Sequence, residues 1–290
     1  MLSIVTATYN RDFLLSRLYD SLIRQNCPDF EWIVVDDGST DDTAILLNTW
    51  ISQKKINIKF FQKVNGGKHT ALNLAFKKSS GDFILIVDSD DLLAFNAVEI
   101  IESKIIEIKK YKFYKRLSGI CFPKADLNGM LIGSTHINSP FICNYLNYRY
   151  KYKINGDKTE VFKREVLLEF PFPKFKNEKF CPEALIWNRI AKKYDMVFYN
   201  DIIYLCEYQV DGLTSKIYEI RKNSPKSTLQ YYYELSLLNL PILIQVKAIL
   251  NYWRFYFVDK NRHNNIAMPK GFLAKLCKLF IYCLSSLKLI

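Results

Sequence analysis

The sequence predicts an α/β protein with a mostly parallel sheet flanked by helices, followed by a helical appendage at the C-terminus. Short apolar runs alternate with amphipathic segments through the first ninety residues, which is typical of strands that alternate with helices. Polar loops rich in Asp, Ser, Thr and Gly follow three of these runs, and the chain ends in two long apolar and aromatic stretches. Strand–helix alternation of this kind favours a parallel sheet with right-handed crossovers.

The first part of the chain is expected to contain four strands separated by three helices. The strand segments are apolar or alternating runs, and they cover residues 2–7, 30–35, 56–62 and 82–87. The helical segments repeat apolar residues at spacings of three and four, and they cover residues 12–25, 41–53 and 69–79. Loops that leave parallel strands open on one edge of the sheet, where ligands bind in such folds. Three polar loops are expected there, at residues 8–11, 36–42 and 88–91.

The middle of the chain has a weaker pattern. We expect helices at residues 94–109 and 182–194 and strands at residues 120–122, 196–199 and 202–208. Four tyrosines also alternate with basic residues, and they are Tyr145, Tyr148, Tyr150 and Tyr152. This alternation predicts an exposed edge strand protected by lysines. A surface that stacks on nucleic-acid bases is the alternative.

The last segment predicts a basic amphipathic helix over residues 272–287. Its apolar face comprises Phe272, Leu273, Leu276, Leu279, Phe280, Cys283, Leu284 and Leu287, whereas its other face carries Lys275, Lys278 and Ser285. Such a helix is typical of binding at a membrane surface, where lysines lie near anionic head groups. The alternative is a helix that docks on the rest of the protein or on a second protomer.

The net charge of the chain is +12, and it is unevenly distributed. The last fifty residues carry eight Lys and Arg and a single Asp, which indicates an anionic partner. The seven cysteines include no Cys-x-x-Cys pair, so we expect reduced thiols of a cytosolic protein. The N-terminus shows no secretory signal, and no uncharged run reaches membrane-spanning length.

The segment Asp88-Ser89-Asp90-Asp91 directly follows the buried strand at residues 82–87. Three carboxylates within four residues repel one another, and each raises the others' pKa values unless a cation lies among them. Hard oxygen ligands of this type suit Mg²⁺ or Mn²⁺. We therefore expect Asp88 and Asp90 to form a divalent-metal site at a strand end. A solvated acidic turn is the alternative.

Four motifs follow one another in the first 92 residues. They are Val5-Thr6-Ala7-Thr8-Tyr9-Asn10-Arg11, Val34-Val35-Asp36-Asp37-Gly38-Ser39-Thr40-Asp41, Asn65-Gly66-Gly67-Lys68-His69-Thr70-Ala71-Leu72-Asn73 and Gly81-Asp82-Phe83-Ile84-Leu85-Ile86-Val87-Asp88-Ser89-Asp90-Asp91. In their order and spacing they resemble glycosyltransferase family 2, whose members are nucleotide-sugar enzymes with the Rossmann-like GT-A fold. The resemblance is close over residues 1–92, loose over residues 156–215 and minimal in the C-terminal segment.

By this resemblance, the first three motifs would bind a UDP-sugar donor. Asp37 would accept a hydrogen bond from the uracil ring, and Thr8 and Tyr9 would border the base. Lys68 would lie near the diphosphate or the donor sugar. A carboxylate that accepts from an imide N–H and a tyrosine that packs on a planar base are physically reasonable partners for a nucleotide.

The resemblance also implies a metal that bridges the diphosphate and neutralises the charge on the UDP leaving group. Asp90 would hold this Mn²⁺ or Mg²⁺, and Asp88 would contact the metal or the ribose. Many family members place a His in the region that corresponds to residues 206–212. This chain has Glu207, Tyr208 and Gln209 there, so the third protein ligand stays open.

The general base is expected in the second half of the chain. Family members usually carry an Asp in a Glu-Asp pair, six residues before an Arg. Glu183 lies six residues before Arg189, but Pro182 replaces the first residue of the pair. By the resemblance, Glu183 would take the proton from an acceptor hydroxyl. The alternative is an acid that only stabilises the first helical turn.

The resemblance thus implies an inverting glycosyltransferase that moves one sugar from a UDP-sugar to an acceptor hydroxyl. The Gln-x-x-Arg-Trp motif of processive synthases is absent. We expect a lipid-linked saccharide acceptor of surface-polysaccharide biosynthesis and a cytoplasmic enzyme that is peripheral on the inner membrane through its C-terminal helix. Residues 1–220 would form the catalytic domain, with a nucleotide-binding half at 1–92 and an acceptor half at 93–220. Residues 221–290 would form a basic helical region.

Three other functions fit parts of the sequence. A nucleotidyltransferase shares this sheet and its metal use, but it is expected to carry a Gly-rich basic loop where this chain has Thr8-Tyr9-Asn10-Arg11. A non-catalytic nucleotide- or glycan-binding module would keep its function without Glu183. A nucleic-acid binder is disfavoured, because carboxylates at three strand ends repel phosphate, so we expect no nucleic-acid partner.

Overall fold

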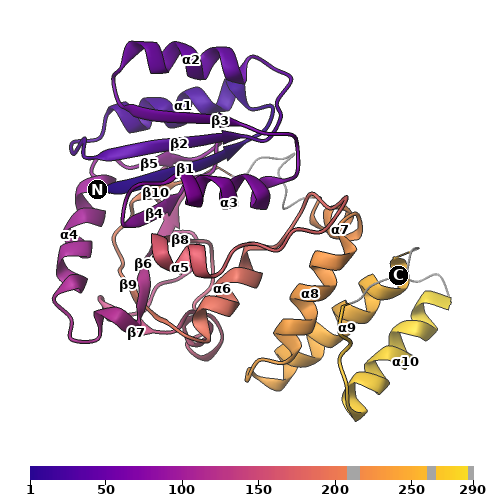
Figure 1. Ribbon diagram of the computed structural model, residues 1–290. Coiled ribbons are helices and arrows are strands. Elements are labelled where there is room, and N and C mark those ends of the chain that lie inside the picture. The colour runs from indigo at the N-terminus through magenta and orange to yellow at the C-terminus, as the bar shows by residue number, and fades with distance from the viewer. Residues whose placement is uncertain (208–215, 260–265, 287–290) are drawn as a thin grey trace. The chain divides into compact units, whose positions relative to one another are not determined.

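The computed structural model describes residues 1–207, 216–259 and 266–286 (Figure 1). The chain forms two compact units, and each is described on its own. The first unit comprises Met1–Pro171 and Arg189–Tyr208. The second unit comprises Phe172–Asn188 and Gln209–Ile290. The predicted boundary at residue 220 separates a catalytic domain from a basic helical region. It describes function as well as compactness, and it stays a prediction.

The first unit is built on one α/β sheet. Its strands in the described residues are β1 (Leu2–Thr8), β2 (Phe30–Asp36), β3 (Asn57–Gln62), β4 (Phe83–Ile86), β5 (Leu92–Leu93), β6 (Leu117–Ala125), β7 (Phe141–Cys143), β8 (Lys158–Lys163), β9 (Asp195–Phe198) and β10 (Tyr204–Leu205). Their order is β3-β2-β1-β4-β8-β6-β10-β5, with β9 paired to β6 and β7. The four N-terminal strands are parallel, as predicted. β8 runs antiparallel to both β4 and β6.

Helices cover both faces of the parallel strands. Figure 1 shows α1 and α2 along one face and α3 on the other, as right-handed crossovers require. The helices that lie within the first unit are α1 (Asp12–Ile23), α2 (Thr43–Gln53), α3 (Lys68–Lys78), α4 (Ala97–Lys109), the 3₁₀ turn η1 (Tyr114–Arg116), the π-helix η2 (Asn147–Lys151) and α5 (Arg164–Glu169). α6 (Glu183–Ala191) begins in the second unit and ends in the first.

The main core lies between the sheet and the helices α1, α2 and α4. Trp32 of β2 is fully buried. Tyr19 of α1 stacks on Trp50 of α2 with ring centroids 4.1 Å apart, and it lies 6.2 Å from the Trp32 ring. This aromatic group fixes α1 and α2 against β2. The polar loops at the ends of β1 and β2 therefore follow strands that are packed into this core.

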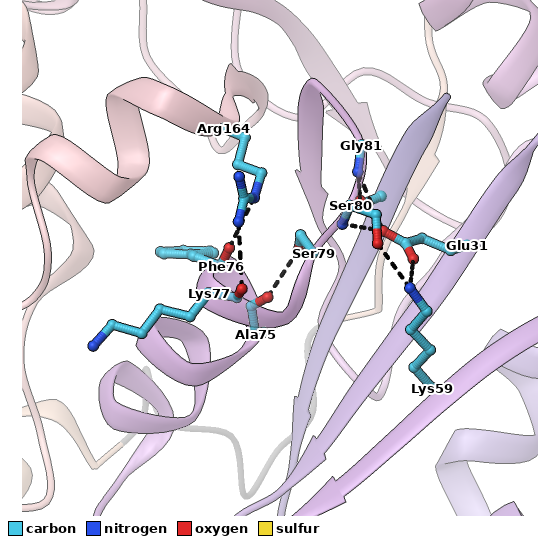
Figure 2. A network of polar contacts seen from close by, with 10 residues as sticks. Glu31, Lys59, Ala75, Phe76, Lys77, Ser79, Ser80, Gly81 and Arg164 are labelled. Carbon is cyan, nitrogen blue, oxygen red and sulfur yellow. Dashed lines mark hydrogen bonds and ion pairs between the residues drawn. The ribbon is translucent and has the colours of Figure 1, made fainter.

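A buried carboxylate anchors the turn that leads into β4. Glu31 of β2 is fully buried and accepts hydrogen bonds from Ser3 Oγ and the Ser80 N–H, each at 2.5 Å (Figure 2). Lys59 Nζ lies 2.6 Å from its second oxygen. Burial acts to raise the pKa of Glu31, but hydrogen bonds from Lys59, Ser3 and Ser80 outweigh it and the pKa is lowered. The ionised carboxylate thus joins β1, β2 and β3 to the start of β4.

The predicted edge strand over the four tyrosines is wrong. Residues Asn147–Lys151 form the π-helix η2. Tyr148 is buried, and its ring stacks on Phe198 of β9 at 3.6 Å. Burying this aromatic ring against a strand distant in sequence determines the local conformation. An alternation read from sequence alone contains no information on that partner.

Two further differences concern strands of the second half. The strand predicted at 202–208 is shorter, because β10 covers only Tyr204–Leu205. Residues 208–215 lie outside the described residues. β8 was not predicted, since its sequence Lys-Thr-Glu-Val-Phe-Lys has few apolar residues.

All seven cysteines are unpaired thiols in the structure.

The second unit carries four helices in its described C-terminal part, and they are α7 (Ile217–Lys222), α8 (Pro225–Ser236), α9 (Ile242–Val258) and α10 (Phe272–Ser286). Their core includes Leu229, Trp253 and Cys277. α10 buries Ala274, Cys277 and Ile281. Its predicted apolar face is exposed, with Phe272, Leu276 and Phe280 among the exposed side chains. Leu287 lies outside the described residues. None of the described helices combines the length and apolar content needed to cross a bilayer.

Candidate functional site

Polar loops meet at the carboxyl ends of β1, β2 and β4. The Asp37 N–H donates to the Thr8 carbonyl at 2.8 Å and continues the β1–β2 pairing. The Asn10 N–H donates to Ser39 Oγ at 2.9 Å, and Asn10 Oδ1 accepts from the Thr40 N–H at 2.8 Å. β4 is the parallel neighbour of β1 on its other side. As predicted, the three loops open on one sheet edge, and they cover residues 8–11, 36–42 and 88–91.

The acidic cluster at this edge comprises Asp88, Asp90 and Asp91. One carboxylate oxygen from each of the three lies within 4.8 Å of the others. Asp88 and Asp90 are partly exposed, whereas Asp91 is buried. Two of the three carboxylates can therefore meet a solute that enters from solvent.

Lys68 brings a positive charge to this cluster from the start of α3. Gly67 directly before it has a φ of +92°, a conformation that glycine adopts without strain. Lys68 Nζ lies 2.5 Å from Asp88 Oδ1, and about a third of each side chain is exposed (33% and 35%). Burial acts to raise the pKa of Asp88, but Lys68 and Lys124 outweigh burial, and the pKa is lowered. Asp88 is thus an ionised carboxylate.

A second lysine lies deeper in the site. β10 pairs with β6 so that Tyr204 is opposite Lys124, and Lys124 Nζ lies 3.9 Å from the centre of the Tyr204 ring. Lys124 Nζ is 3.7 Å from Asp91 Oδ2. Burial acts to lower the pKa of Lys124, but the negative charges of Asp88 and Asp91 outweigh burial, and the pKa is raised. Lys124 is therefore a fixed cation.

Asp91 is held inside the site by hydrogen bonds. The Tyr204 hydroxyl donates to Asp91 Oδ2 at 2.7 Å and accepts from the Asp88 N–H at 3.0 Å. Burial raises the pKa of Asp91 to about 6, against the opposing effect of Lys124. Asp91 therefore supports the loop from inside. Asp88 and Asp90 are the carboxylates that face outward.

Asp37 holds the glycine loop before α3. Its two carboxylate oxygens accept from the N–H groups of Gly66 at 3.0 Å and Gly67 at 2.6 Å. Lys63 forms an ion pair with the same carboxylate, and the Asn65 side chain donates to the Asp37 carbonyl at 2.8 Å. Asp37, which is expected to bind uracil, thus lies at the sheet edge where the three polar loops open. Its hydrogen bonds also hold the glycine loop that leads to Lys68. Its contact with a base stays a prediction.

Thr8 and Tyr9 lie beside Asp37 at the end of β1. Thr8 is buried, and its Oγ1 atom has no hydrogen-bond partner among the described residues. Tyr9 is 47% exposed. A buried hydroxyl without a partner and an exposed ring are groups that a bound nucleotide could satisfy. The structure therefore brings together Thr8, Tyr9, Asp37, Lys68, Asp88 and Asp90 on one edge of the first unit.

The sequence singles out two acids in the second half of the chain, Glu183 as the expected base and Glu207 in the region where many family members carry a His. Glu183 is the first residue of α6 and belongs to the second unit, and its role as a base stays a prediction. Glu207 forms an ion pair with Arg17 at 3.1 Å. Tyr208 and Gln209 lie outside the described residues. The third metal ligand that was left open by sequence therefore stays open.

Lys124 and Tyr204 are the site residues that sequence reasoning missed. They are 80 positions apart in the chain, and the pairing of β6 with β10 brings them together. A lysine at the end of the apolar run Ile120-Cys121-Phe122-Pro123 was the one available signal. It gave no indication of a partner.

The acidic cluster fits a divalent ion in its chemistry. Asp88 is ionised and Asp90 lies beside it, and both offer the hard oxygen ligands that Mg²⁺ and Mn²⁺ prefer. Asp91 already uses one oxygen for Tyr204 and Lys124. Asp88 and Asp90 are therefore the residues that would hold the ion, and this assignment stays a prediction.

Comparison with known proteins finds a family match in the N-terminal part of the chain. Residues 3–112 match the sequence model of "Glycosyl transferase family 2". An uncharacterized glycosyltransferase of Rickettsia bellii is 34% identical over 137 residues, which is 47% of this chain and 19% of that protein. The poly(ribitol-phosphate) beta-N-acetylglucosaminyltransferase TarS of Staphylococcus aureus is 34% identical over 93 residues, which is 31% of this chain and 16% of TarS. The chain thus spans about a fifth of the length of these relatives.

Solved structures share the fold over nearly the whole chain. S. aureus TarS 1–349, in complex with UDP-GlcNAc, superposes with a TM-score of 0.60 at 20% identity and covers 97% of this chain and 79% of that one. The mannosyltransferase PcManGT of Pyrobaculum calidifontis, in complex with GDP-Man and Mn²⁺, gives a TM-score of 0.58 at 16% identity and covers 100% of this chain and 80% of that one. The predicted GT-A fold is confirmed by these likenesses.

Proposed function

We propose, from the premise that residues 3–112 belong to glycosyl transferase family 2, that the protein transfers one sugar from a UDP-sugar to an acceptor hydroxyl. The observation that carries the proposal is the pair Asp88 and Asp90 at the carboxyl end of β4, beside Lys68. This edge offers ligands for a divalent ion and a positive charge for a diphosphate. Relatives and neighbours that bind or use nucleotide-sugars support the same assignment.

The residues at the sheet edge have separate tasks in this proposal. Thr8, Tyr9 and Asp37 bind the uracil base, and Lys68 contacts the diphosphate. Asp90 holds Mn²⁺ or Mg²⁺, and Asp88 contacts the ion or the ribose. The bound ion would neutralise the charge that develops on UDP as the sugar leaves. Lys124 and Tyr204 keep Asp91 and the loop in place.

Glu183 is the proposed general base. In an inverting displacement, the acceptor hydroxyl attacks the anomeric carbon from the face opposite UDP, and Glu183 takes its proton. The support is its position six residues before Arg189 and its place at the start of α6. A glutamate can do this if it reaches hydrogen-bond distance of the hydroxyl.

An anionic membrane surface is the proposed partner of α10. The helix exposes Phe272 (78%), Leu279 (61%) and Phe280 (57%), while the last fifty residues carry eight basic residues and one acid. Apolar side chains beside lysines suit the boundary between head groups and acyl chains. This location supports a lipid-linked saccharide of surface-polysaccharide biosynthesis as the acceptor, and a cytoplasmic enzyme that is peripheral on the membrane.

The deciding experiment is UDP release by the purified protein from a panel of UDP-sugars, with GDP-mannose as the contrasting donor. Each donor is tested with Mn²⁺, with Mg²⁺ and with EDTA. We expect slow hydrolysis of one UDP-sugar that needs metal and is lost in Asp90→Asn. Glu102→Gln, which removes a partly exposed acid from α4, is the control variant that keeps the wild-type rate.

The other outcomes separate the alternatives. Release of GDP from GDP-mannose, without release of UDP from any UDP-sugar, would show that the donor carries guanine and not uracil. The proposal of sugar transfer would stand. Formation of pyrophosphate from a nucleoside triphosphate and a sugar phosphate would favour a nucleotidyltransferase. Metal-dependent UDP binding without turnover, in the presence and absence of membrane extracts, would favour a non-catalytic binding module.

A further inference from the structure

The segment that carries the proposed base is attached to the helices of the second unit by one carboxylate. Glu178 lies five residues before Glu183 and is 8% exposed. It accepts hydrogen bonds from two N–H groups of α8, that of Lys226 at 2.7 Å and that of Ser227 at 2.9 Å. The Ser227 hydroxyl in turn donates to the Phe180 carbonyl at 2.6 Å. Three hydrogen bonds therefore join this segment to the first turn of α8.

This attachment takes the place of a local helix cap. The first N–H groups of a helix have no partner within it, and a serine at the N-cap position commonly accepts one of them. Ser224 occupies that position but makes no such bond, and the next residue, Pro225, has no N–H. The two N–H groups that follow are those that Glu178 accepts. A carboxylate suits this place, because negative charge is stabilised at the positive end of the helix dipole.

The backbone before Glu178 is shaped for this contact. Asn177 has a φ of +66°, a left-handed conformation in which asparagine is enriched among residues other than glycine. The Glu178 N–H donates to the Phe175 carbonyl at 3.2 Å and closes the turn. A hydrogen-bonded turn therefore directs the Glu178 side chain to α8.

Very little chain separates this contact from the proposed base. Only Cys181 and Pro182 lie between Phe180 and Glu183, and α6 begins at Glu183. The Pro182 carbonyl accepts from the Leu185 N–H at 3.1 Å. Cys181 and Leu185 are buried, so the chain is packed on both sides of Glu183. The contact with α8 and the proposed base also belong to the same compact unit.

We propose that Glu178 is a positioning residue for Glu183, and that the C-terminal helices thereby take part in sugar transfer. The inference rests on the proposed function, in which Glu183 takes the proton of the acceptor hydroxyl. Proton transfer requires hydrogen-bond distance, and a misplacement of about 1 Å can slow a reaction about 10²-fold. The residues proposed to bind UDP belong to the first unit, so loss of the Glu178 contact leaves UDP binding unchanged.

The test uses two variants that weaken the contact from opposite sides. Glu178→Gln removes the charge and one acceptor oxygen but keeps the size of the side chain. Ser227→Ala removes the hydrogen bond to the Phe180 carbonyl. The matched control is Glu219→Gln, because Glu219 is a 60% exposed acid on α7 in the same unit. Circular dichroism checks that each variant of the full chain is folded.

Hydrogen–deuterium exchange, followed by mass spectrometry, measures whether the contact holds the segment. We expect peptides within residues 172–188 to exchange about tenfold faster in Glu178→Gln than in wild type, because hydrogen bonds to a charged group are lost. Peptides of β1, β2 and β4 should exchange as in wild type, and so should every peptide of Glu219→Gln. Wild-type exchange of residues 172–188 in both Glu178→Gln and Ser227→Ala overturns the proposal.

A double-mutant cycle separates positioning from a general loss of stability. Transfer is measured from radiolabelled donor to a lipid-linked saccharide extract or to poly(ribitol phosphate). Glu178→Gln should lower kcat about tenfold and leave the affinity for UDP with Mn²⁺ unchanged. In a Glu183→Gln background, the same substitution should have almost no further effect, because both changes remove one function.

Two kinetic results would overturn the proposal. One is wild-type transfer by Glu178→Gln, and the other is an equal loss of transfer from this substitution with and without Glu183. A failure of the proposed function is a different result, since it is seen as no UDP release from any donor. The exchange measurement involves no sugar transfer, so it tests the contact independently.

Discussion

The hydroxyl of Tyr204 lies 2.7 Å from Oδ2 of Asp91, across 113 positions of sequence. The same hydroxyl accepts the Asp88 N–H, so one side chain of β10 fixes both ends of the acidic loop. Asp91 is buried, with a pKa raised by burial to about 6. The relationship shows that the loop depends on a distant strand for its shape.

Replacing Tyr204 with Phe is therefore expected to lower the free energy of unfolding by about 1–3 kcal/mol, since it removes one hydrogen bond to the buried Asp91 carboxylate and another from the Asp88 N–H. The ring that lies under Lys124 is kept. Urea unfolding monitored by tryptophan fluorescence measures the change. Thr159→Val is the control, because the buried Thr159 hydroxyl has no partner among the described residues. Equal stability of Tyr204→Phe and wild type would show that the hydrogen bonds do not support the loop.

The N-terminal half of this site could be predicted from sequence, and the reason is local. β1, α1, β2, α2, β3, α3 and β4 follow one another with short connections, and parallel strands bring their exit loops to one edge. Thr8, Asp37 and Asp88 therefore had to lie close together. The carboxylates of Asp88 and Asp90 then indicated a metal, whereas a nucleotide at Thr8 and Asp37 is what the resemblance to glycosyltransferase family 2 implies.

The second half could not be predicted in the same way, because long-range pairing determines it. β8 was missed since its buried Lys158 and Lys163 look like surface residues. Tyr148 was placed on an edge strand because its stacking partner Phe198 lies fifty residues away. Lys124 entered the site only through the pairing of β6 with β10. Each case depends on a contact that no local pattern encodes.

The Glu31 network predicts a loss of stability in acid. The folded-state pKa of Glu31 is lowered, so its ionised form contributes stability above the unfolded pKa of about 4.3, and this contribution is lost as pH falls through the folded pKa. We expect Glu31→Gln to cost about 2 kcal/mol at neutral pH, and the difference from wild type to shrink below about pH 4. Urea unfolding between pH 3 and pH 7 measures both values.

A second acid gives the control for this pH profile. Glu169 is also paired, with Lys193 at 2.5 Å, but that pair is on the surface. Glu169→Gln should therefore differ much less from wild type at neutral pH. A Glu31→Gln difference that stays constant between pH 3 and pH 7 would show that the ionised form has no special stability in this network.

The exposed face of α10 predicts binding to anionic vesicles. Phe272, Leu276 and Phe280 are exposed, so their joint replacement by Ser should leave the fold intact. We expect wild type to sediment with vesicles that contain phosphatidylglycerol more than with pure phosphatidylcholine, and the triple variant to bind at least tenfold more weakly, because each lost side chain gives up apolar burial.

The control for membrane binding uses exposed apolar residues of the first unit. Phe13 and Ile45 are 70% and 67% exposed, and their replacement by Ser should not change vesicle binding. Equal loss in both variants would point to nonspecific adsorption of apolar surface. Retained binding by the triple variant would contradict the docking of α10 on lipid, and a change in oligomeric state would then favour a protein partner.

The proposed base gives the last prediction. Glu183→Gln should reduce transfer to an acceptor about 10²- to 10⁴-fold, because the acceptor hydroxyl loses its proton acceptor. Metal-dependent UDP binding should be unchanged, since Asp37, Asp88 and Asp90 are intact. Transfer is measured with radiolabelled donor and two acceptors, a bacterial lipid-linked saccharide extract and poly(ribitol phosphate). Glu165→Gln, which removes a first-turn acid from α5, measures the effect of losing a helix-terminal charge alone. A similarly small effect of both variants would mean that Glu183 only stabilises its helix and that another residue takes the proton.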